Sequence, residues 1–86
     1  MARFKISIAR SARKELESLP RYVVEKVVIE IEHLAENPFP KGSKKLKGDK
    51  NRWRIRVGDY RIIYSILFKE LIIDIIRIRH RKEAYN

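Results

Sequence analysis

The chain has no cysteine and few residues that break regular structure. Of its 86 residues, three are glycine, three are proline and none is cysteine. Without cysteine, neither a disulfide framework nor a zinc knuckle can form. The two histidines, His33 and His80, lie far apart in the sequence. We therefore expect no structural metal and no cofactor.

Long apolar runs are also missing. No stretch approaches the ~20 apolar residues of a membrane span, and the first ten residues, MARFKISIAR, are charged throughout rather than carrying the apolar segment of a signal peptide. These features predict a cytoplasmic protein. The length suits one compact domain over residues 1–86, with a small core.

Negative charge is scarce in the second half of the chain. Residues 1–40 hold seven Lys and Arg against six Glu, whereas residues 41–86 hold fourteen against five acids, within a net charge of +10. Charge needed only for solubility would not be distributed in this way. A surface that binds nucleic acid, an acidic membrane or an acidic protein would concentrate its positive charge in this way.

The hydrophobic pattern predicts six elements. Residues 3–9 alternate as a half-buried strand, and two segments, 9–19 and 21–36, place apolar residues at helical spacing on either side of Pro20. The loop NPFPKGS follows, and then three β-branched and aromatic runs at 51–57, 60–67 and 71–79 predict an antiparallel meander. The order β-α-α-β-β-β predicts an α+β fold: a small antiparallel-rich sheet with a two-helix hairpin on one face.

Side chains of the meander alternate between apolar residues and arginine. In NRWRIRV, the apolar residues share one strand face, so Arg52, Arg54 and Arg56 share the other. In the next strand, the predicted core set of Tyr60, Ile62, Tyr64 and Ile66 leaves Arg61 opposite. In the last strand, if Ile72, Ile76 and Ile78 face the helices, the arginines there take the open face.

Arginines from three strands are thus expected to converge on the open face: Arg54, Arg56, Arg61, Arg79 and Arg81. On a single strand such residues would usually be a solvated face. Like charges facing each other across strands cost stability, so a bound anion is the natural explanation for three strands contributing them. The planar guanidinium binds phosphate oxygens bidentately and stacks on bases. RNA or DNA is the predicted partner.

Two segments of the chain resemble a known toxin superfamily. LKGDKNRWRIRVGDYRIIYSI followed by IIRIRHRKEAY is similar to the RelE/ParE superfamily of bacterial and archaeal toxin–antitoxin pairs, and specifically to its RelE branch. The likeness runs across nearly the whole chain. GDYRIIY is common to the superfamily, whereas RHRKEAY is the more discriminating part.

The resemblance implies an activity and partners. The RelE branch contains endoribonucleases that cut mRNA in the ribosomal A site, by attack of the mRNA 2′-hydroxyl on the adjacent phosphate and without metal. It implies contact with rRNA and mRNA, and an antitoxin that wraps around the toxin. Covering so basic a half-molecule calls for an acidic antitoxin. We expect a monomeric free toxin and a hetero-oligomer with the antitoxin, with no membrane partner.

The resemblance also implies a catalytic site at Arg54, Arg56, Arg61, Arg81 and Tyr85. The strand arginines would hold the phosphate, Arg81 would stabilise or protonate the leaving 5′ oxygen, and Tyr85 would stack on or orient a base. The two positions on the first meander strand carry lysine in the best-known members and arginine here.

A guanidinium, with a pKa above ~12, is a poor general base. His80 is a candidate for that role, because Arg79 and Arg81 on either side disfavour its cationic form. The alternative is that His80 packs at the end of its strand. Further RNA contacts are expected at Lys45, Lys47, Lys50, Arg52 and Arg79. The lysines belong to a basic loop that attracts rRNA phosphates or is simply solvated.

Two other functions stay open. The ParE branch uses the same fold to poison DNA gyrase without nuclease activity and lacks the Arg and Tyr end. A non-catalytic RNA- or ribosome-binding module would use the same basic face without cutting RNA.

Overall fold

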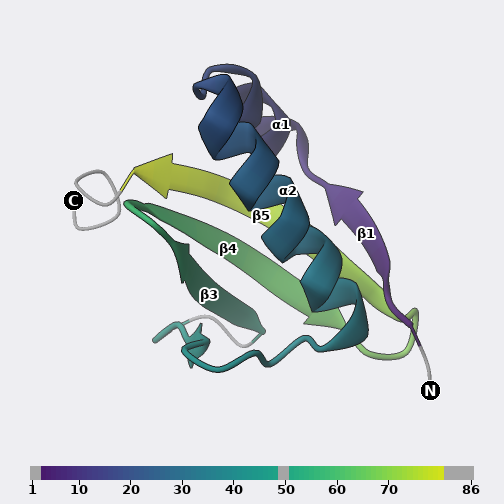
Figure 1. Ribbon diagram of the computed structural model, residues 1–86. Coiled ribbons are helices and arrows are strands. Elements are labelled where there is room, and N and C mark those ends of the chain that lie inside the picture. Colours follow the sequence, from purple (N-terminus) through teal and green to yellow (C-terminus); the bar gives the residue numbers. More distant parts are fainter. Residues whose placement is uncertain (1–2, 49–50, 81–86) are drawn as a thin grey trace.

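The computed structural model describes residues 3–48 and 51–80 and has α+β architecture (Figure 1). The elements in chain order are β1 (Lys5–Ile8), α1 (Arg10–Glu17), α2 (Arg21–Glu36), β2 (Lys44–Lys45), β3 (Arg52–Val57), β4 (Tyr60–Leu67) and β5 (Ile72–His80). The predicted fold class is confirmed. The structure adds one element, because the short strand β2 lies in a segment that the sequence indicated to be a loop.

The strands form one mixed sheet in the order β1-β5-β4-β3-β2. β1 runs parallel to β5, and the other neighbouring strands are antiparallel. A two-residue turn joins β3 to β4, and Gly58 occupies its first position with φ +59°. A type II′ turn requires this backbone conformation there and matches the twist of the strands it connects. The predicted meander is therefore present.

β5 carries a bulge that changes which of its side chains are buried. Ile63 pairs with Arg77 and the next residue, Tyr64, pairs with Ile75, so Ile76 is an extra residue without a partner in β4. Before the bulge the buried residues are Ile73 and Ile75, and after it Ile78. The expectation that Ile72 and Ile76 face the helices is wrong, because simple alternation cannot anticipate the extra residue.

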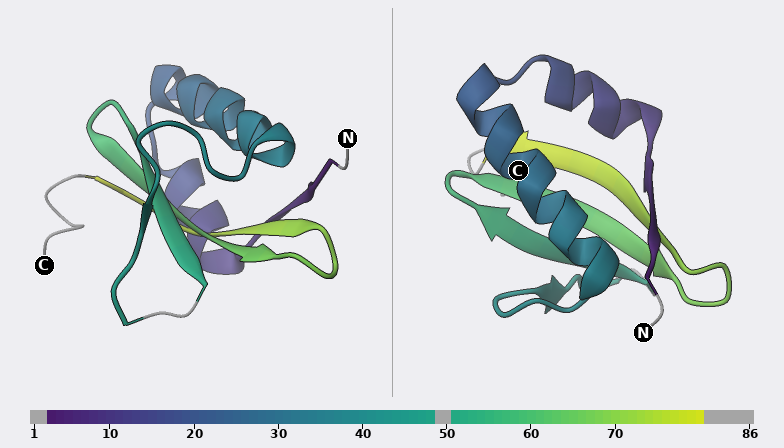
Figure 2. Two further views of the ribbon diagram at one scale, coloured as in Figure 1. Left: turned by 90° about the horizontal axis from the view of Figure 1, so that it is seen from below. Right: turned by 45° about the vertical axis from the view of Figure 1, so that its right-hand side comes forward.

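The two helices contribute to one core in different ways. α2 crosses one face of the sheet and buries Val23, Val27, Ile31 and Leu34 at helical spacing, whereas α1 lies beside β5 at the border of the sheet (Figure 2). Ala12 of α1 is fully buried in the same core. The helices leave the opposite face of the sheet uncovered in the described part of the chain.

Tyr64 closes the core near the end of α2. Its side chain is fully buried, and its hydroxyl donates a hydrogen bond to the carbonyl oxygen of Pro38 at 2.7 Å. Burial disfavours the phenolate and raises the pKa of Tyr64 to about 12. This tyrosine therefore has a structural role, as predicted from its position among the core residues.

Neither helix in the described residues is long and apolar enough to cross a membrane.

Candidate nucleic-acid interface

The sheet register brings arginines from three strands into one row. Arg56 on β3 pairs with Arg61 on β4, and Arg61 pairs with Arg79 on β5. Residues paired across strands point to the same face, which here is the face opposite α2. We call this uncovered face the arginine face. The convergence expected of these three residues is therefore present in the backbone register.

The adjacent row extends the positive charge to the edge of the sheet. Lys44 on β2 pairs with Arg54 on β3, Arg54 pairs with Ile63, and Ile63 pairs with Arg77. The sequence placed Lys44 in a basic loop that attracts rRNA phosphates or is solvated. It enters the arginine face because β2 adds to the outer edge of β3, a long-range pairing that two lysines alone do not reveal.

These rows border a pocket with an almost purely cationic lining. The pocket has a volume of about 390 Å³ and is lined by Gly42, Lys44, Arg54, Arg56 and Arg61, a set we call the arginine pocket. Arg61 is only 6% exposed, Arg54 is half-buried and Arg56 is exposed, so cations line the pocket from its floor to its rim. Gly42 adopts φ +93° in the turn before β2, a conformation that favours glycine.

The arginine pocket suits a phosphodiester. It presents guanidinium groups from two adjacent strands and an ammonium from a third, and no acid is among its lining residues in the described part of the chain. Guanidinium groups bind phosphate oxygens through paired hydrogen bonds and neutralise charge that builds on them. Partial burial strengthens these interactions relative to those of exposed cations.

Arg79 lies on the same face but is held by an acid. Its Nε lies 3.3 Å from Oε2 of Glu15, and Nη1 of Arg77 lies 3.6 Å from the same oxygen. Glu15 belongs to α1, at the border of the sheet. Arg79 is thus next to Arg61 in the register and pairs with Glu15 at its guanidinium.

His80 lies on the other side of the sheet from the arginine pocket. It pairs with Tyr60, and the two rings meet edge to face with centroids 5.2 Å apart. Both line a hollow with Leu19 and Ile78 next to the helices. Among the described residues, the structure therefore does not bring His80 together with the arginine pocket. Strand alternation accounts for this, because a residue directly after Arg79 points to the opposite face.

The remaining predicted RNA contacts are distributed differently. Arg52 is exposed on the arginine face, two residues from Arg54 and outside the pocket lining. Lys45 pairs with Trp53, so its position in the register belongs to the helix side, and Lys47 is exposed beyond β2. Lys50, Arg81 and Tyr85 lie outside the described residues.

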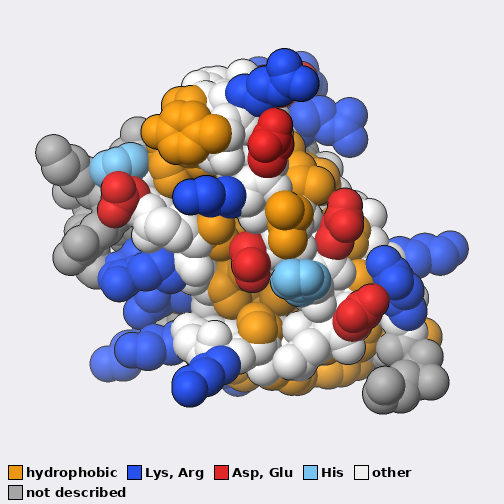
Figure 3. Space-filling view, viewed as in Figure 1, with side chains coloured by type: hydrophobic (Ala, Val, Ile, Leu, Met, Phe, Trp, Pro, Cys, Tyr) orange, Lys and Arg blue, Asp and Glu red, His pale blue; other side chains and the backbone are white. Residues whose placement is uncertain are grey.

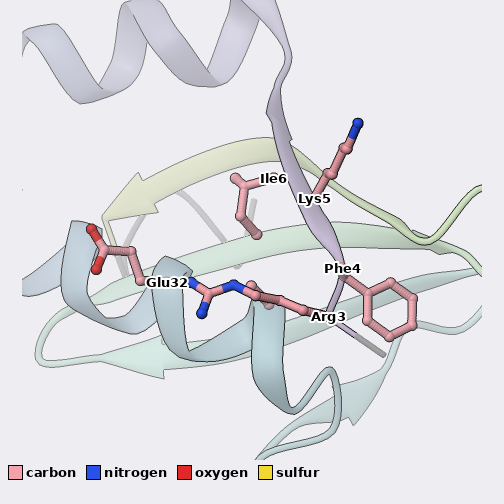
Figure 4. Close-up of a pocket in the computed structure, with 6 residues that line it drawn as sticks. Arg3, Phe4, Lys5, Ile6 and Glu32 are labelled. Carbon is pink, nitrogen blue, oxygen red and sulfur yellow. The ribbon is translucent and has the colours of Figure 1, made fainter. Parts of the chain in front are cut away.

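The helix-covered face has a different charge pattern. Figure 3 shows acidic and basic side chains interspersed with apolar ones over α2, while Lys and Arg side chains gather at the lower left, near β2 and β3. A second hollow, of about 450 Å³, lies between β1 and α2 and is lined by both Arg3 and Glu32 (Figure 4). Arg3 also pairs with Glu36 at 3.3 Å. Because acidic and basic side chains both line this hollow, it is a poorer phosphate site than the arginine pocket.

Comparison with known proteins points to one family. The family model for the ParE toxin of the type II toxin–antitoxin system parDE matches residues 6–85. The putative toxin RelE1 of Methanocaldococcus jannaschii is 36% identical over 87 residues, covering 98% of this chain and 97% of that protein.

Two crystal structures of toxin–antitoxin complexes share the fold. In the archaeal RelE–RelB complex from Pyrococcus horikoshii OT3, the matching chain is 30% identical with a TM-score of 0.81, covering 94% of this chain and 97% of that one. In the RelBE2 complex from Mycobacterium tuberculosis, the match is 26% identical with a TM-score of 0.84, covering 94% of each chain. These findings confirm the resemblance. The chain belongs to the ParE toxin family of type II toxin–antitoxin systems, and the relatives described above carry the name RelE.

Proposed function

We propose that this toxin is a ribosome-dependent endoribonuclease that cleaves mRNA in the A site and binds the scissile phosphate in the arginine pocket. The observation that carries the proposal is a pocket lined by three arginines and one lysine, with Arg61 buried at its floor. The similarity to RelE toxins supports the same reading, since the RelE branch is associated with this reaction.

In the proposed reaction, the mRNA 2′-hydroxyl attacks the adjacent phosphorus and the bond to the 5′ oxygen breaks. The products are a 2′,3′-cyclic phosphate and a 5′-hydroxyl end. Negative charge builds on the phosphate oxygens in the transition state, and Arg54, Arg56 and Arg61 stabilise it. Arg81 would assist the leaving oxygen and Tyr85 would orient a base, as the family resemblance implies.

Lys44 supplies what the arginines lack. A guanidinium stays protonated and cannot accept the 2′-hydroxyl proton, whereas the neutral form of an amine can. Lys44 is the one amine that lines the arginine pocket among the described residues. We assign it the proton-accepting role in place of His80, which faces the other side of the sheet.

Primer extension on translated mRNA tests the proposal. In a purified translation system, the parent toxin should produce cuts in phase with codons, and only on message that ribosomes are translating. Arg54→Ala should abolish these cuts, whereas Arg13→Gln, which removes an exposed positive charge on α1, should retain them. Cutting of naked RNA, or intact message at all toxin concentrations, would contradict the proposal.

A second candidate is inhibition of DNA gyrase, because the matching family model is described by the ParE toxin. A supercoiling assay with purified gyrase separates the two functions. Loss of supercoiling together with intact translated mRNA would favour this second candidate.

The proposed partner is an antitoxin. Both crystal structures compared above are of complexes between a toxin and an antitoxin. We expect this chain to bind an acidic antitoxin that covers the arginine face and thereby excludes mRNA.

A further inference from the structure

We propose that Glu15 is a positioning residue for the arginine face. Its carboxylate holds Arg79, and with it Arg77, at the border of the sheet, so that phosphate binding is confined to the arginine pocket. This inference rests on the proposed role of that pocket in binding RNA.

The contacts of Glu15 are unusually complete for a residue near the surface. One carboxylate oxygen, Oε1, accepts a hydrogen bond from the backbone N–H of Ile78 at 2.9 Å. The other, Oε2, lies 3.3 Å from Nε of Arg79 and 3.6 Å from Nη1 of Arg77. The side chain of Glu15 is only 23% exposed, compared with 36% for Arg79 and 42% for Arg77. The acid is therefore the fixed member of the group.

The backbone of β5 explains why Glu15 is fixed. β1 pairs with β5 only as far as Ile75, so the edge of β5 beyond that residue has no neighbouring strand in the described chain. α1 takes its place: Ser11 Oγ donates to the carbonyl oxygen of Ile76 at 2.8 Å, and Glu15 accepts from Ile78. An edge strand requires such partners for its polar groups. Glu15 therefore cannot move with the arginine side chains without breaking its hydrogen bond to the backbone of β5.

The register explains why the position of Arg79 matters. Arg79 is the third member of the row that begins with Arg56 and Arg61. Glu15 compensates charge at the β5 end of this row, whereas at the β3 end none of the described residues that line the arginine pocket is acidic. A phosphate is therefore drawn to the β3 end. Without the carboxylate, the guanidinium of Arg79 would be available to anions along the whole row.

The variant Glu15→Gln isolates the charge. The amide oxygen can still accept the hydrogen bond from Ile78, but its attraction for Arg79 and Arg77 is lost. Glu17→Gln is the matched control, because it removes the same charge from an exposed position on the same helix. Binding is measured with a fluorescent single-stranded RNA in which 2′-O-methyl groups prevent cleavage. The measurement is repeated over a series of salt concentrations.

Glu15→Gln should bind this RNA about threefold to tenfold more tightly than the parent at low salt, with a slope of log affinity against log salt that is steeper by about one phosphate contact. Glu17→Gln should stay within about twofold of the parent, since a distant exposed charge is screened. In addition, Arg79→Gln should reduce affinity more in the Glu15→Gln background than in the parent. A change in stability alone would move neither the salt slope nor this dependence on Arg79.

Equal affinities and slopes for Glu15→Gln and Glu17→Gln would overturn the inference, as would a gain in affinity that does not depend on Arg79. Failure of the pocket itself would look different. In that case Arg54→Ala would bind the RNA probe as well as the parent and would still cleave translated mRNA, whatever the behaviour of Glu15→Gln.

Discussion

At the scale of single residues, two kinds of cationic side chain line the arginine pocket. Arg61 is buried at its floor, while Lys44 reaches it from the edge strand β2. The first is suited to stabilising charge on phosphate oxygens, since a planar guanidinium donates several hydrogen bonds in a fixed geometry. The second carries an amine, which we propose accepts the 2′-hydroxyl proton. These roles lead to different results when either side chain is replaced.

Arg61→Ala should reduce ribosome-dependent cleavage by about 10²- to 10³-fold, the usual loss when a donor to a developing anion is removed. The rate of mRNA cleavage under single-turnover conditions measures this effect. Because Arg61 is buried, thermal unfolding of the variant must show that it remains folded. A folded Arg61→Ala toxin that cleaves at the parent rate would contradict the proposed role.

Lys44→Arg should retain binding to mRNA-loaded ribosomes and lose most of the cleavage rate. The substitution keeps a positive charge and replaces the amine by a guanidinium, which does not release its proton to form a neutral base. Binding by sedimentation and cleavage by primer extension are measured on the same samples. If Lys44→Arg cleaves at the parent rate while Lys44→Ala does not, the lysine contributes charge alone.

Tyr64→Phe should change the response to alkali. The pKa of Tyr64 is raised to about 12 in the folded protein, compared with about 10 in the unfolded chain. The contribution of Tyr64 to the free energy of unfolding is therefore fully present below pH 10. It is lost as the pH rises from 10 to 12, by up to about 1.4 kcal/mol per pH unit. Urea unfolding at several alkaline pH values should show a shallower decline for Tyr64→Phe. The same slope in both proteins would refute this assignment.

At the scale of elements, α1 acts as a cover for the open edge of β5. Its side chains form hydrogen bonds with β5 backbone groups where β1 has ended, and Ser11 contacts the carbonyl of Ile76, the bulged residue. Bulges and free edges both leave polar backbone groups without ladder partners. The helix therefore stabilises the strand that carries Arg77 and Arg79.

Ser11→Ala should lower the free energy of unfolding by about 1 kcal/mol, because it leaves the partly buried carbonyl of Ile76 without its hydroxyl donor. Ser18→Ala is a suitable control, since the Ser18 hydroxyl makes an exposed bond to Glu15 within its own helix region. Urea denaturation of the two variants measures the difference. A larger loss for Ser18→Ala would mean that the contact with β5 is not the important one.

At the scale of the whole molecule, charge and apolar surface are distributed over different faces. The arginine face is basic, whereas α2 carries Glu25 and Glu32 and exposes Tyr22 and Ile29, which are 67% and 52% accessible. A partner that covers both surfaces needs an acidic segment for one and an apolar segment for the other. The proposed antitoxin is therefore expected to carry both kinds of segment.

The association rate of toxin and antitoxin should fall steeply as salt rises, by at least tenfold between 50 and 500 mM, because opposite charges steer the encounter and salt screens them. Stopped-flow fluorescence, in which the toxin is mixed with its cognate antitoxin, measures the association rate. The dissociation rate should depend much less on salt, since it reflects the contacts that are already formed. An association rate independent of salt would contradict an acidic partner for the arginine face.

The sequence by itself determined the features that depend on local periodicity. Alternation of arginine with apolar residues assigned Arg54, Arg56 and Arg61 to one strand face, and helical spacing gave the bounds of α2, Arg21–Glu36, without error. His80 is the exception, because the sequence made it a candidate base at the arginine site, although it directly follows Arg79 and so points to the opposite face. These results follow because side-chain direction within a strand or helix depends on neighbouring residues alone.

Only the tertiary structure decided which residues from distant segments meet. Lys44 joins the arginine pocket through the pairing of β2 with β3, and Glu15 reaches Arg79 because α1 lies where β1 stops. The bulge at Ile76 sets which isoleucines are buried. Each of these depends on strand register and on the packing of an element against a distant one, and such long-range pairings leave no periodic signal in the sequence.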